Sequence, residues 1–103
     1  MAKSIKMRAR QSGAETTVKA LISHAMETGL RKDKKGNKIP AHHITEVTCE
    51  HGGKVVMTAL WGPAVSKNPY LSFKFSGAKA GDMVKLAWVD NKGESDSVEG
   101  AIK

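Results

Sequence analysis

The chain has 103 residues, 40% of them hydrophobic and 26% charged, a balance typical of one soluble globular domain over residues 1–103 that folds without metals or disulfides. No apolar run approaches the about 20 residues of a membrane-spanning helix, and the N-terminal residues form no secretory signal, so the plain expectation is a cytoplasmic protein that does not enter a membrane. Seventeen basic residues against ten acidic ones give a net charge of +7, which favours an anionic partner.

Alternation of apolar and polar residues with a period of two dominates the chain and predicts β-strands. The first strand sets Ile5, Met7 and Ala9 against lysines and arginines. Turn signals such as Gly52-Gly53 and Lys92-Gly93 separate the runs. In chain order, the predicted strands are 4–10, 16–23, 43–50, 54–60, 70–76, 83–90 and 94–102. About seven short antiparallel strands with regular turns predict an all-β protein, an immunoglobulin-like β-sandwich.

A long polar loop, roughly residues 24–41, separates the second predicted strand from the third, and glycines and Pro40 interrupt it. Its basic residues are Arg31, Lys32, Lys34, Lys35 and Lys38. A nucleic-acid surface usually adds stacking aromatic residues, but this loop has none, and the phenylalanines and Trp88 alternate toward the core. The sequence therefore predicts no nucleic-acid binding.

The sequence offers no recognisable catalytic constellation. No serine lies in a nucleophile elbow, no glycine-rich loop opens a helix, and Asp33, Asp90 and Asp96 are expected to be solvated carboxylates in turns or on edge strands. Cys49, the only cysteine, shares a strand face with Val47 and is expected to be a buried, inert thiol. The prediction is a protein without a catalytic residue and without a cofactor.

Four histidines and five methionines raise the alternative of a copper site, because imidazole and thioether ligands suit copper. The stretch His24-Ala25-Met26 holds one such pair. The histidines are otherwise scattered along the chain, and a strand would send His42 and His43 to opposite faces. The sequence therefore predicts no metal site, and a stand-alone copper-binding periplasmic domain stays as the alternative function.

Four segments in matching order carry a resemblance to a known family. They are LISHAMETGLRKD at 21–33, followed by Gly36 and Ile39-Pro40, then VTCE at 47–50, PAVSKNPY at 63–70 and LAWVDNKG at 86–93. Over nearly the whole chain they resemble SoxZ, the family of small subunits in the SoxYZ carrier of bacterial sulfur-compound oxidation. The resemblance implies a non-catalytic subunit that binds and stabilises SoxY in a heterodimer. In that family, SoxY carries the intermediates of thiosulfate or sulfide oxidation on a cysteine in its C-terminal arm.

The same resemblance implies transient contact with a c-type cytochrome complex, a sulfate-releasing hydrolase and a sulfur dehydrogenase. It also changes the expected location, because SoxZ-like subunits cross the membrane attached to SoxY, which bears the export signal. The resemblance thus implies a periplasmic protein that is exported with SoxY and has no signal of its own, against the plain interpretation of the N-terminus.

Two loops are the candidate SoxY interface, because they carry much of the family-like sequence without being dictated by strand alternation. The candidate residues are His24, Met26, Glu27 and Arg31 in one loop and Pro63, Asn68, Pro69 and Tyr70 in the other. The alternative for each of these residues is a structural role in a turn, in which its side chain forms hydrogen bonds with nearby backbone groups. Whether strands pair edge to edge with SoxY or pack face to face stays open. A sulfur-oxidising enzyme acting alone, through Cys49, is the remaining alternative function.

Overall fold

The computed structural model describes residues 4–62 and 65–103, which form seven β-strands. The strands are β1 (Ile5–Ser12), β2 (Glu15–Ile22), β3 (Ile44–His51), β4 (Lys54–Leu60), β5 (Tyr70–Ser76), β6 (Met83–Asp90) and β7 (Ser95–Ala101). Every predicted strand is present, and its ends differ from the predicted ones by at most two residues. In the described ranges, no helix has the length and apolar character to cross a membrane.

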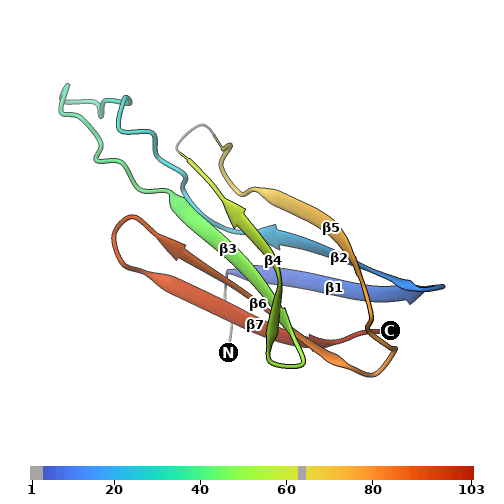
Figure 1. Ribbon diagram of the computed structural model, residues 1–103. Helices are drawn as coiled ribbons and strands as arrows, with labels where there is room; N and C mark the ends of the chain where they lie inside the picture. Colours follow the sequence, from blue (N-terminus) through green and yellow to red (C-terminus); the bar gives the residue numbers. More distant parts are fainter. Residues whose placement is uncertain (1–3, 63–64) are drawn as a thin grey trace.

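The strands form two antiparallel sheets that pack face to face (Figure 1). One sheet has three strands in the order β1-β2-β5, and the other has four in the order β4-β3-β6-β7. Strands β1 and β7 lie beside each other and close one side of the sandwich. Ser4 joins the sheets there, because it donates twice to the carboxylate of Asp96 and accepts the indole N–H of Trp88. The prediction of an immunoglobulin-like sandwich of seven antiparallel strands is confirmed.

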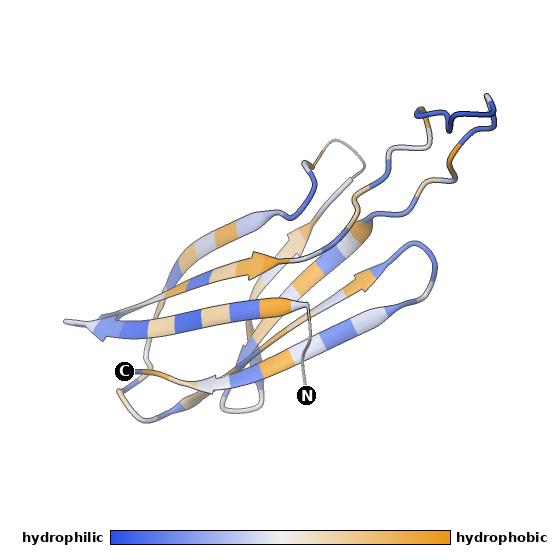
Figure 2. Cartoon of the chain, turned by 180° about the vertical axis from the view of Figure 1, so that it is seen from behind, coloured by the Kyte–Doolittle hydropathy of each residue, from blue (hydrophilic) through white to orange (hydrophobic). Residues whose placement is uncertain are grey.

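Inward-facing apolar residues from both sheets form the core. Figure 2 shows hydrophobic and hydrophilic residues alternating along β1, as a strand with one buried face requires. Ile22, Ile44 and Leu86 are fully buried, and Trp88 is buried with them as predicted. Phe73 points inward too but is only half-buried, because β5 is an edge strand on the side away from the β1–β7 contact.

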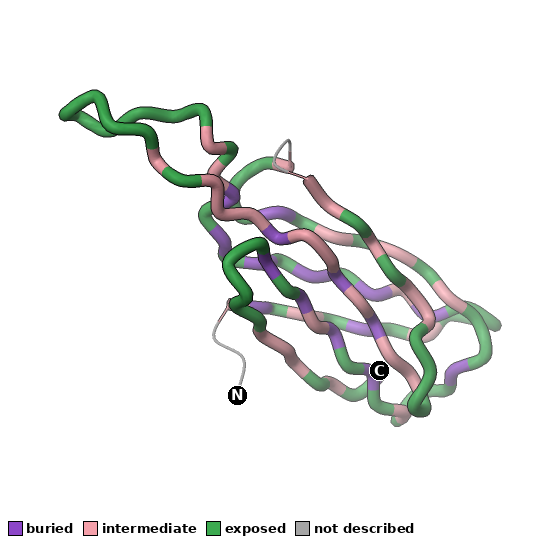
Figure 3. Tube along the Cα trace, turned by 60° about the vertical axis from the view of Figure 1, so that its left-hand side comes forward, coloured by how far each residue is buried: buried purple, intermediate pink, exposed green. Residues whose placement is uncertain are grey.

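Residues 23–43, between β2 and β3, extend far beyond the sandwich (Figure 1). Backbone bridges join Glu27 to His42 and, farther out, Lys32 to Lys38. The segment from Glu27 to His42 is called the arm below, and the end of the sandwich from which it projects is called the arm end. Figure 3 shows that most of the arm is exposed. The predicted loop is thus a hydrogen-bonded extension, and the molecule measures 53 × 21 × 19 Å.

Candidate functional site

The two predicted interface loops lie side by side at the base of the arm. Asn68 joins them, because its Oδ1 accepts the backbone N–H of His24 at 3.1 Å and its own N–H donates to the carbonyl of His24 at 3.1 Å. The carbonyl of Pro69 accepts the N–H of Ile22 at 3.0 Å. Asn68 has a positive φ of 50°, a region that asparagine enters more readily than most residues. Two segments far apart in sequence therefore form one structural unit.

The eight predicted interface residues divide by burial. Those with exposed or half-buried side chains are Glu27, Arg31, Asn68 and Tyr70. Those that are buried within the chain are His24, Met26 and Pro69. Burial argues against direct contact between the buried side chains and a partner, and gives them a supporting role instead. Pro63 lies outside the described residues.

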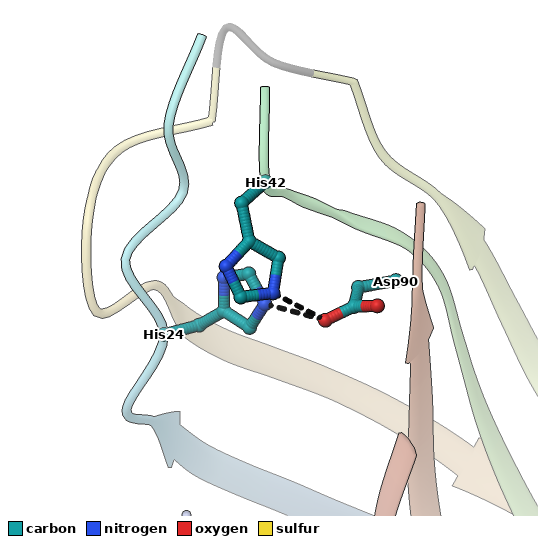
Figure 4. A group of neighbouring side chains, drawn as sticks. All are labelled: His24, His42 and Asp90. Atoms are coloured by element: carbon teal, nitrogen blue, oxygen red, sulfur yellow. Dashed lines mark hydrogen bonds and ion pairs between the residues drawn. The ribbon is translucent and has the colours of Figure 1, made fainter. Parts of the chain in front are cut away.

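His24, His42 and Asp90, called the His–Asp cluster below, meet behind these loops (Figure 4). The Nε2 atoms of His24 and His42 lie 3.1 Å and 2.8 Å from the same carboxylate oxygen, Oδ2 of Asp90. His24 follows β2, His42 precedes β3 and Asp90 ends β6. The side chains of His24 and Asp90 are 4% and 0% exposed, and that of His42 is 23% exposed. The cluster thus ties both sides of the arm's base to the four-stranded sheet.

The hydrogen-bond partners decide where the ring protons of the two histidines lie. Nδ1 of His24 faces the backbone N–H of Met26 at 3.0 Å, and because that group can only donate, Nδ1 accepts. The ring proton of His24 is therefore on Nε2, which donates to Asp90. Nε2 of His42 faces two carboxylates, Asp90 at 2.8 Å and Glu94 at 3.4 Å, so it also carries a proton. Both rings turn N–H groups, and not lone pairs, toward the centre of the cluster.

The carboxylate of Asp90 is fully paired. Its Oδ1 accepts the backbone N–H groups of Lys92 at 3.0 Å and Glu94 at 2.9 Å, while Oδ2 accepts the two rings. Burial alone would raise the pKa of Asp90, but these hydrogen bonds outweigh it and hold the pKa at about 2, against an ordinary value of 3.8. The expectation that Asp90 is a solvated carboxylate is wrong, because its own turn and the base of the arm enclose it.

The His–Asp cluster brings together three side chains that are able to ligate a metal, so the description of the histidines as scattered is wrong for His24 and His42. A metal-bound histidine presents a ring lone pair to the metal and usually donates its other N–H to an acceptor. His24 does the reverse, since its second nitrogen accepts from Met26. Metal at Nε2 of His24 would require the proton to move to Nδ1 and would break that hydrogen bond. The contacts favour a structural role over a metal site, for copper as for zinc.

Met26, the thioether of the pair noted in the sequence, is also used inside the fold. It is 5% exposed, and its sulfur accepts the backbone N–H of Ile44 at 3.4 Å. Its φ is +48°, an uncommon conformation for a bulky residue, and the hydrogen bond from its N–H to His24 holds it there. This strained turn redirects the chain from β2 into the arm while its side chain fills the core.

Glu27 and Arg31 form a bidentate pair on the arm. The Nε–Oε1 and Nη2–Oε2 distances are 2.9 Å and 2.7 Å. The hydrogen bond from Arg31 lowers the pKa of Glu27, and the same bond raises the pKa of Arg31. Because the side chain of Arg31 is 67% exposed, the pair contributes little to stability. It gives the arm a rigid polar feature close to its base.

Cys49 is buried in β3 with no exposed surface, which confirms the predicted buried thiol. Burial raises the pKa of the thiol to about 11, and the charge of Glu50 acts in the same direction. The thiolate is the nucleophilic form, so little of it is present at neutral pH. The alternative of an enzyme acting through Cys49 therefore lacks a poised nucleophile.

Exposed apolar side chains gather at the arm end. Of the seven large hydrophobic residues exposed in the described chain, the five on the arm or at the arm end are Leu21, Leu30, Leu60, Tyr70 and Val89, 42% to 79% exposed. Tyr70 lies opposite Leu21 across the β2–β5 pairing. Leu60 and Val89 both lie opposite Glu46, on its two sides. The two at the other end are Val55 and Met83. Leu21 and Tyr70 face outward from the three-stranded sheet, and Leu60 and Val89 face outward from the four-stranded sheet, so two exposed apolar pairs lie at one end of the sandwich. Exposed apolar groups of this kind are typical of a contact surface.

The sequence prediction missed the roles of His42 and Asp90. A usable signal exists for Asp90, since an aspartate that begins a turn such as Asp90-Asn91-Lys92-Gly93 often accepts a backbone N–H two residues on. No local signal identifies His42. Its meeting with Asp90 depends on the register between β3 and β6, in which Ile44 lies opposite Asp90.

A family model described as "Sulphur oxidation protein SoxZ" matches residues 5–101 of the chain. The match begins with β1 and ends with β7, so it includes both sheets, the arm and the His–Asp cluster. No curated protein matches the sequence.

Proposed function

Because the chain belongs to the SoxZ family of sulphur oxidation proteins, we propose that it is the non-catalytic subunit of a sulfur-compound carrier and that it works by binding SoxY. The observation that carries this proposal is the family match over residues 5–101. In such a carrier the sulfur intermediates sit on a cysteine of SoxY. Cys49 is buried and has a pKa of about 11, so it is a poor nucleophile, which supports the proposal that the cysteine of SoxY carries the intermediates.

The proposed SoxY contact lies at the arm end of the sandwich. Stable heterodimers need an apolar centre with a polar rim. Tyr70 and Leu60 offer exposed apolar area there, while Arg31 and Asn68 offer exposed polar groups. The His–Asp cluster holds the base of the arm in one shape before a partner arrives, and a pre-ordered surface loses less entropy on binding.

The proposed carrier works in the periplasm, where the chain arrives by export with SoxY. Its transient partners are then the c-type cytochrome complex, the sulfate-releasing hydrolase and the sulfur dehydrogenase that the family implies. These statements are supported by the family to which the chain belongs, and no contact among the residues that the structure describes bears on them. Immunoblots of periplasmic and cytoplasmic fractions should place the chain in the periplasm only when SoxY is co-expressed.

Co-expression with SoxY from the same organism tests the proposed heterodimer. The wild-type pair should elute as one species of combined mass in size-exclusion chromatography with light scattering. Tyr70→Glu and Leu60→Glu place a charge in the proposed apolar contact and should weaken the heterodimer at least about 10-fold. Val55→Glu is the matched control, because Val55 is an exposed apolar residue of the same strand as Leu60, at its other end.

Each result has a separate meaning. A wild-type chain that stays monomeric beside folded SoxY contradicts the proposed function. A heterodimer that tolerates Tyr70→Glu and Leu60→Glu but not Val55→Glu moves the contact to the opposite end and leaves the function standing. Turnover of thiosulfate or sulfide by the isolated chain, lost in Cys49→Ser, would support the alternative of an independent enzyme.

A further inference from the structure

Basic side chains cover the outer face of the three-stranded sheet. They are Lys6, Arg8, Arg10, Lys19 and Lys74, all exposed, and this set is called the basic face below. They alternate along their strands with inward residues such as Ala9 and Val18, so they point to the same side of the sheet. The register places Arg8 opposite Lys19 and sets Arg10 and Lys74 on either side of Thr17.

The basic face has almost no compensating charge of its own. Glu15, at the far end of β2, is the only acidic residue in the three strands. In the part of the chain that the structure describes, every ion pair involves other residues. Like charges directly opposite each other across a strand pair destabilise a sheet. The Arg8–Lys19 pair therefore carries a cost, and none of the ion pairs between the described residues offsets it.

On the outer face of the four-stranded sheet, basic and acidic residues lie next to each other. Across its strands, Lys85 lies between Glu50 and Glu99, so the charges alternate in sign along one row. Opposite charges in such pairs are favourable. The chain thus balances charge on one outer face and leaves it unbalanced on the other, and the unbalanced face is where an anionic partner gains most.

The polar groups of the basic face favour a protein partner over a single-stranded nucleic acid or a lipid surface. Single-stranded nucleic acid needs aromatic platforms, and Tyr70, at the arm-end edge, is the only aromatic residue that points outward from these three strands. A lipid surface needs apolar side chains that insert between the lipids. Leu21, opposite Lys6, and Tyr70 are the outward apolar side chains of these strands, and both lie at the arm-end edge. Between the other basic residues lie short polar side chains instead, such as Thr17 and Ser72.

We propose that the basic face is a second interaction surface, used by the carrier to dock the acidic surface of a protein that visits it transiently. This inference rests on the proposed function and adds to the SoxY contact at the arm end. Charge complementarity of this kind raises the association rate more than the affinity, and it weakens as salt is added. Fast association and weak affinity suit a surface that must bind and release several enzymes in turn.

The test compares two fourfold variants with the same loss of charge. The face variant carries Arg8→Gln, Arg10→Gln, Lys19→Gln and Lys74→Gln, and the arm variant carries Lys32→Gln, Lys34→Gln, Lys35→Gln and Lys38→Gln. Each is purified as the heterodimer with SoxY, and its association rates with the purified cytochrome complex, hydrolase and dehydrogenase are measured from low to high salt. For at least one enzyme, the face variant should associate at least about 10-fold more slowly at low salt, with a flatter salt dependence. The arm variant should stay within about 3-fold of wild type.

Circular dichroism and thermal unfolding check that both variants fold, and removal of the Arg8–Lys19 repulsion should leave the face variant at least as stable as wild type.

Equal slowing in both variants would mean that net charge, and not this face, steers the enzymes, and would overturn the proposal. Loss of binding only to a 20-base-pair DNA duplex or to vesicles with 30% phosphatidylglycerol would overturn it too. A face variant that no longer binds SoxY would make this face the permanent interface, which overturns the inference but not the proposed function. If wild type forms no heterodimer, the proposed function fails, and the same rates measured on the chain alone decide the role of the basic face.

Discussion

Asp90 is the single residue on which the arm end depends most. Its carboxylate accepts two backbone N–H groups and two ring N–H groups, from the buried His24 and the half-buried His42. A buried donor that loses its acceptor costs about 1–3 kcal/mol. The His–Asp cluster therefore links the stability of the sandwich to the shape of the surface at the base of the arm.

Asp90→Asn should lower the free energy of unfolding by about 3 kcal/mol at neutral pH, since an amide cannot accept from all four donors. Asp82→Asn is the matched control, because Asp82 also accepts from a histidine, His51, at 2.8 Å, but its side chain is 43% exposed. We expect a clearly smaller loss there, because solvent screens an exposed pair. Urea unfolding of the three proteins gives both values, and equal losses would contradict a special role for Asp90.

The same variant tests the pH dependence. The pKa of Asp90 is about 2 in the folded protein, below its ordinary 3.8, so its contribution is complete above that ordinary value and is lost as the pH falls toward 2. At about 1.4 kcal/mol per pH unit, the full contribution is about 2.5 kcal/mol, of which about 2 kcal/mol is lost by pH 2. Between about pH 5 and pH 2, wild type should lose about 2 kcal/mol more stability than Asp90→Asn. Parallel profiles for the two proteins would show that Asp90 does not titrate in this way.

At the scale of the element, the arm persists without a packed core because its own backbone and turn groups pair. Beyond the Glu27–His42 bridge, the N–H of Ile39 donates to the carbonyl of Arg31 at 2.8 Å. Asp33 closes the tip by accepting the backbone N–H groups of Lys35 at 2.9 Å and Asn37 at 3.0 Å. Such hydrogen bonds are individually weak in water, so the arm should open locally more often than the sandwich.

Two glycines of the arm provide a matched pair of substitutions. Gly29 and Gly36 both have positive φ, +87° and +83°, where a side chain is strained. A Cβ at Gly29 would also lie 3.2 Å from Cβ of Ala41, whereas a Cβ at Gly36 would meet nothing within 4 Å. Gly29→Ala should therefore favour local opening more than Gly36→Ala.

Amide hydrogen exchange at His42 and Ile39 measures this opening. A strained residue costs about 1–2 kcal/mol, so Gly36→Ala should speed exchange about 10-fold, and Gly29→Ala should exceed that. Exchange in the core strands should stay unchanged in both variants. If Gly36→Ala had the larger effect, the close approach of Gly29 to Ala41 would not hold in solution.

At the scale of the whole molecule, the chain is elongated and its charge is divided between regions. Its radius of gyration is 15.4 Å, against about 13 Å for a compact domain of this length. The arm accounts for the difference, because it extends the long axis to 53 Å without adding to the core. The basic face and the arm also hold most of the positive charge, while acidic residues lie among the strands of the four-stranded sheet.

Replacement of residues 31–38 by Asn-Gly tests whether the arm is independent of the sandwich. The two-residue turn connects Leu30 to Ile39 and leaves both residues of the Glu27–His42 bridge in place. The melting temperature should change by less than about 3 °C, because no core residue is removed. The radius of gyration from small-angle X-ray scattering should fall. Loss of cooperative unfolding in this variant would show that the arm stabilises the sandwich.

Much of the fold was predictable from the sequence, and less of the candidate site was. The strand from Met83 to Asp90 was predicted with the correct ends and with Val84 and Leu86 inward, because both follow from local alternation. The interface residues remain predictions, although the burial of His24 and Met26 now separates support from surface. A local pattern does not report burial in a loop, since a loop has no period, and its exposure depends on what packs against it.

The sequence by itself determined the number of strands, their bounds to within two residues, the inward-facing set and the family, because the alternation, the turn glycines and the ordered motifs are local features of the chain. Only the tertiary structure decided which polar residues meet. His42 and Asp90 are 48 residues apart, and Arg8 faces Lys19 only through the β1–β2 register. Strand order and register arise from the cooperative packing of two sheets, so contacts between polar side chains become visible only when the whole sandwich is in place.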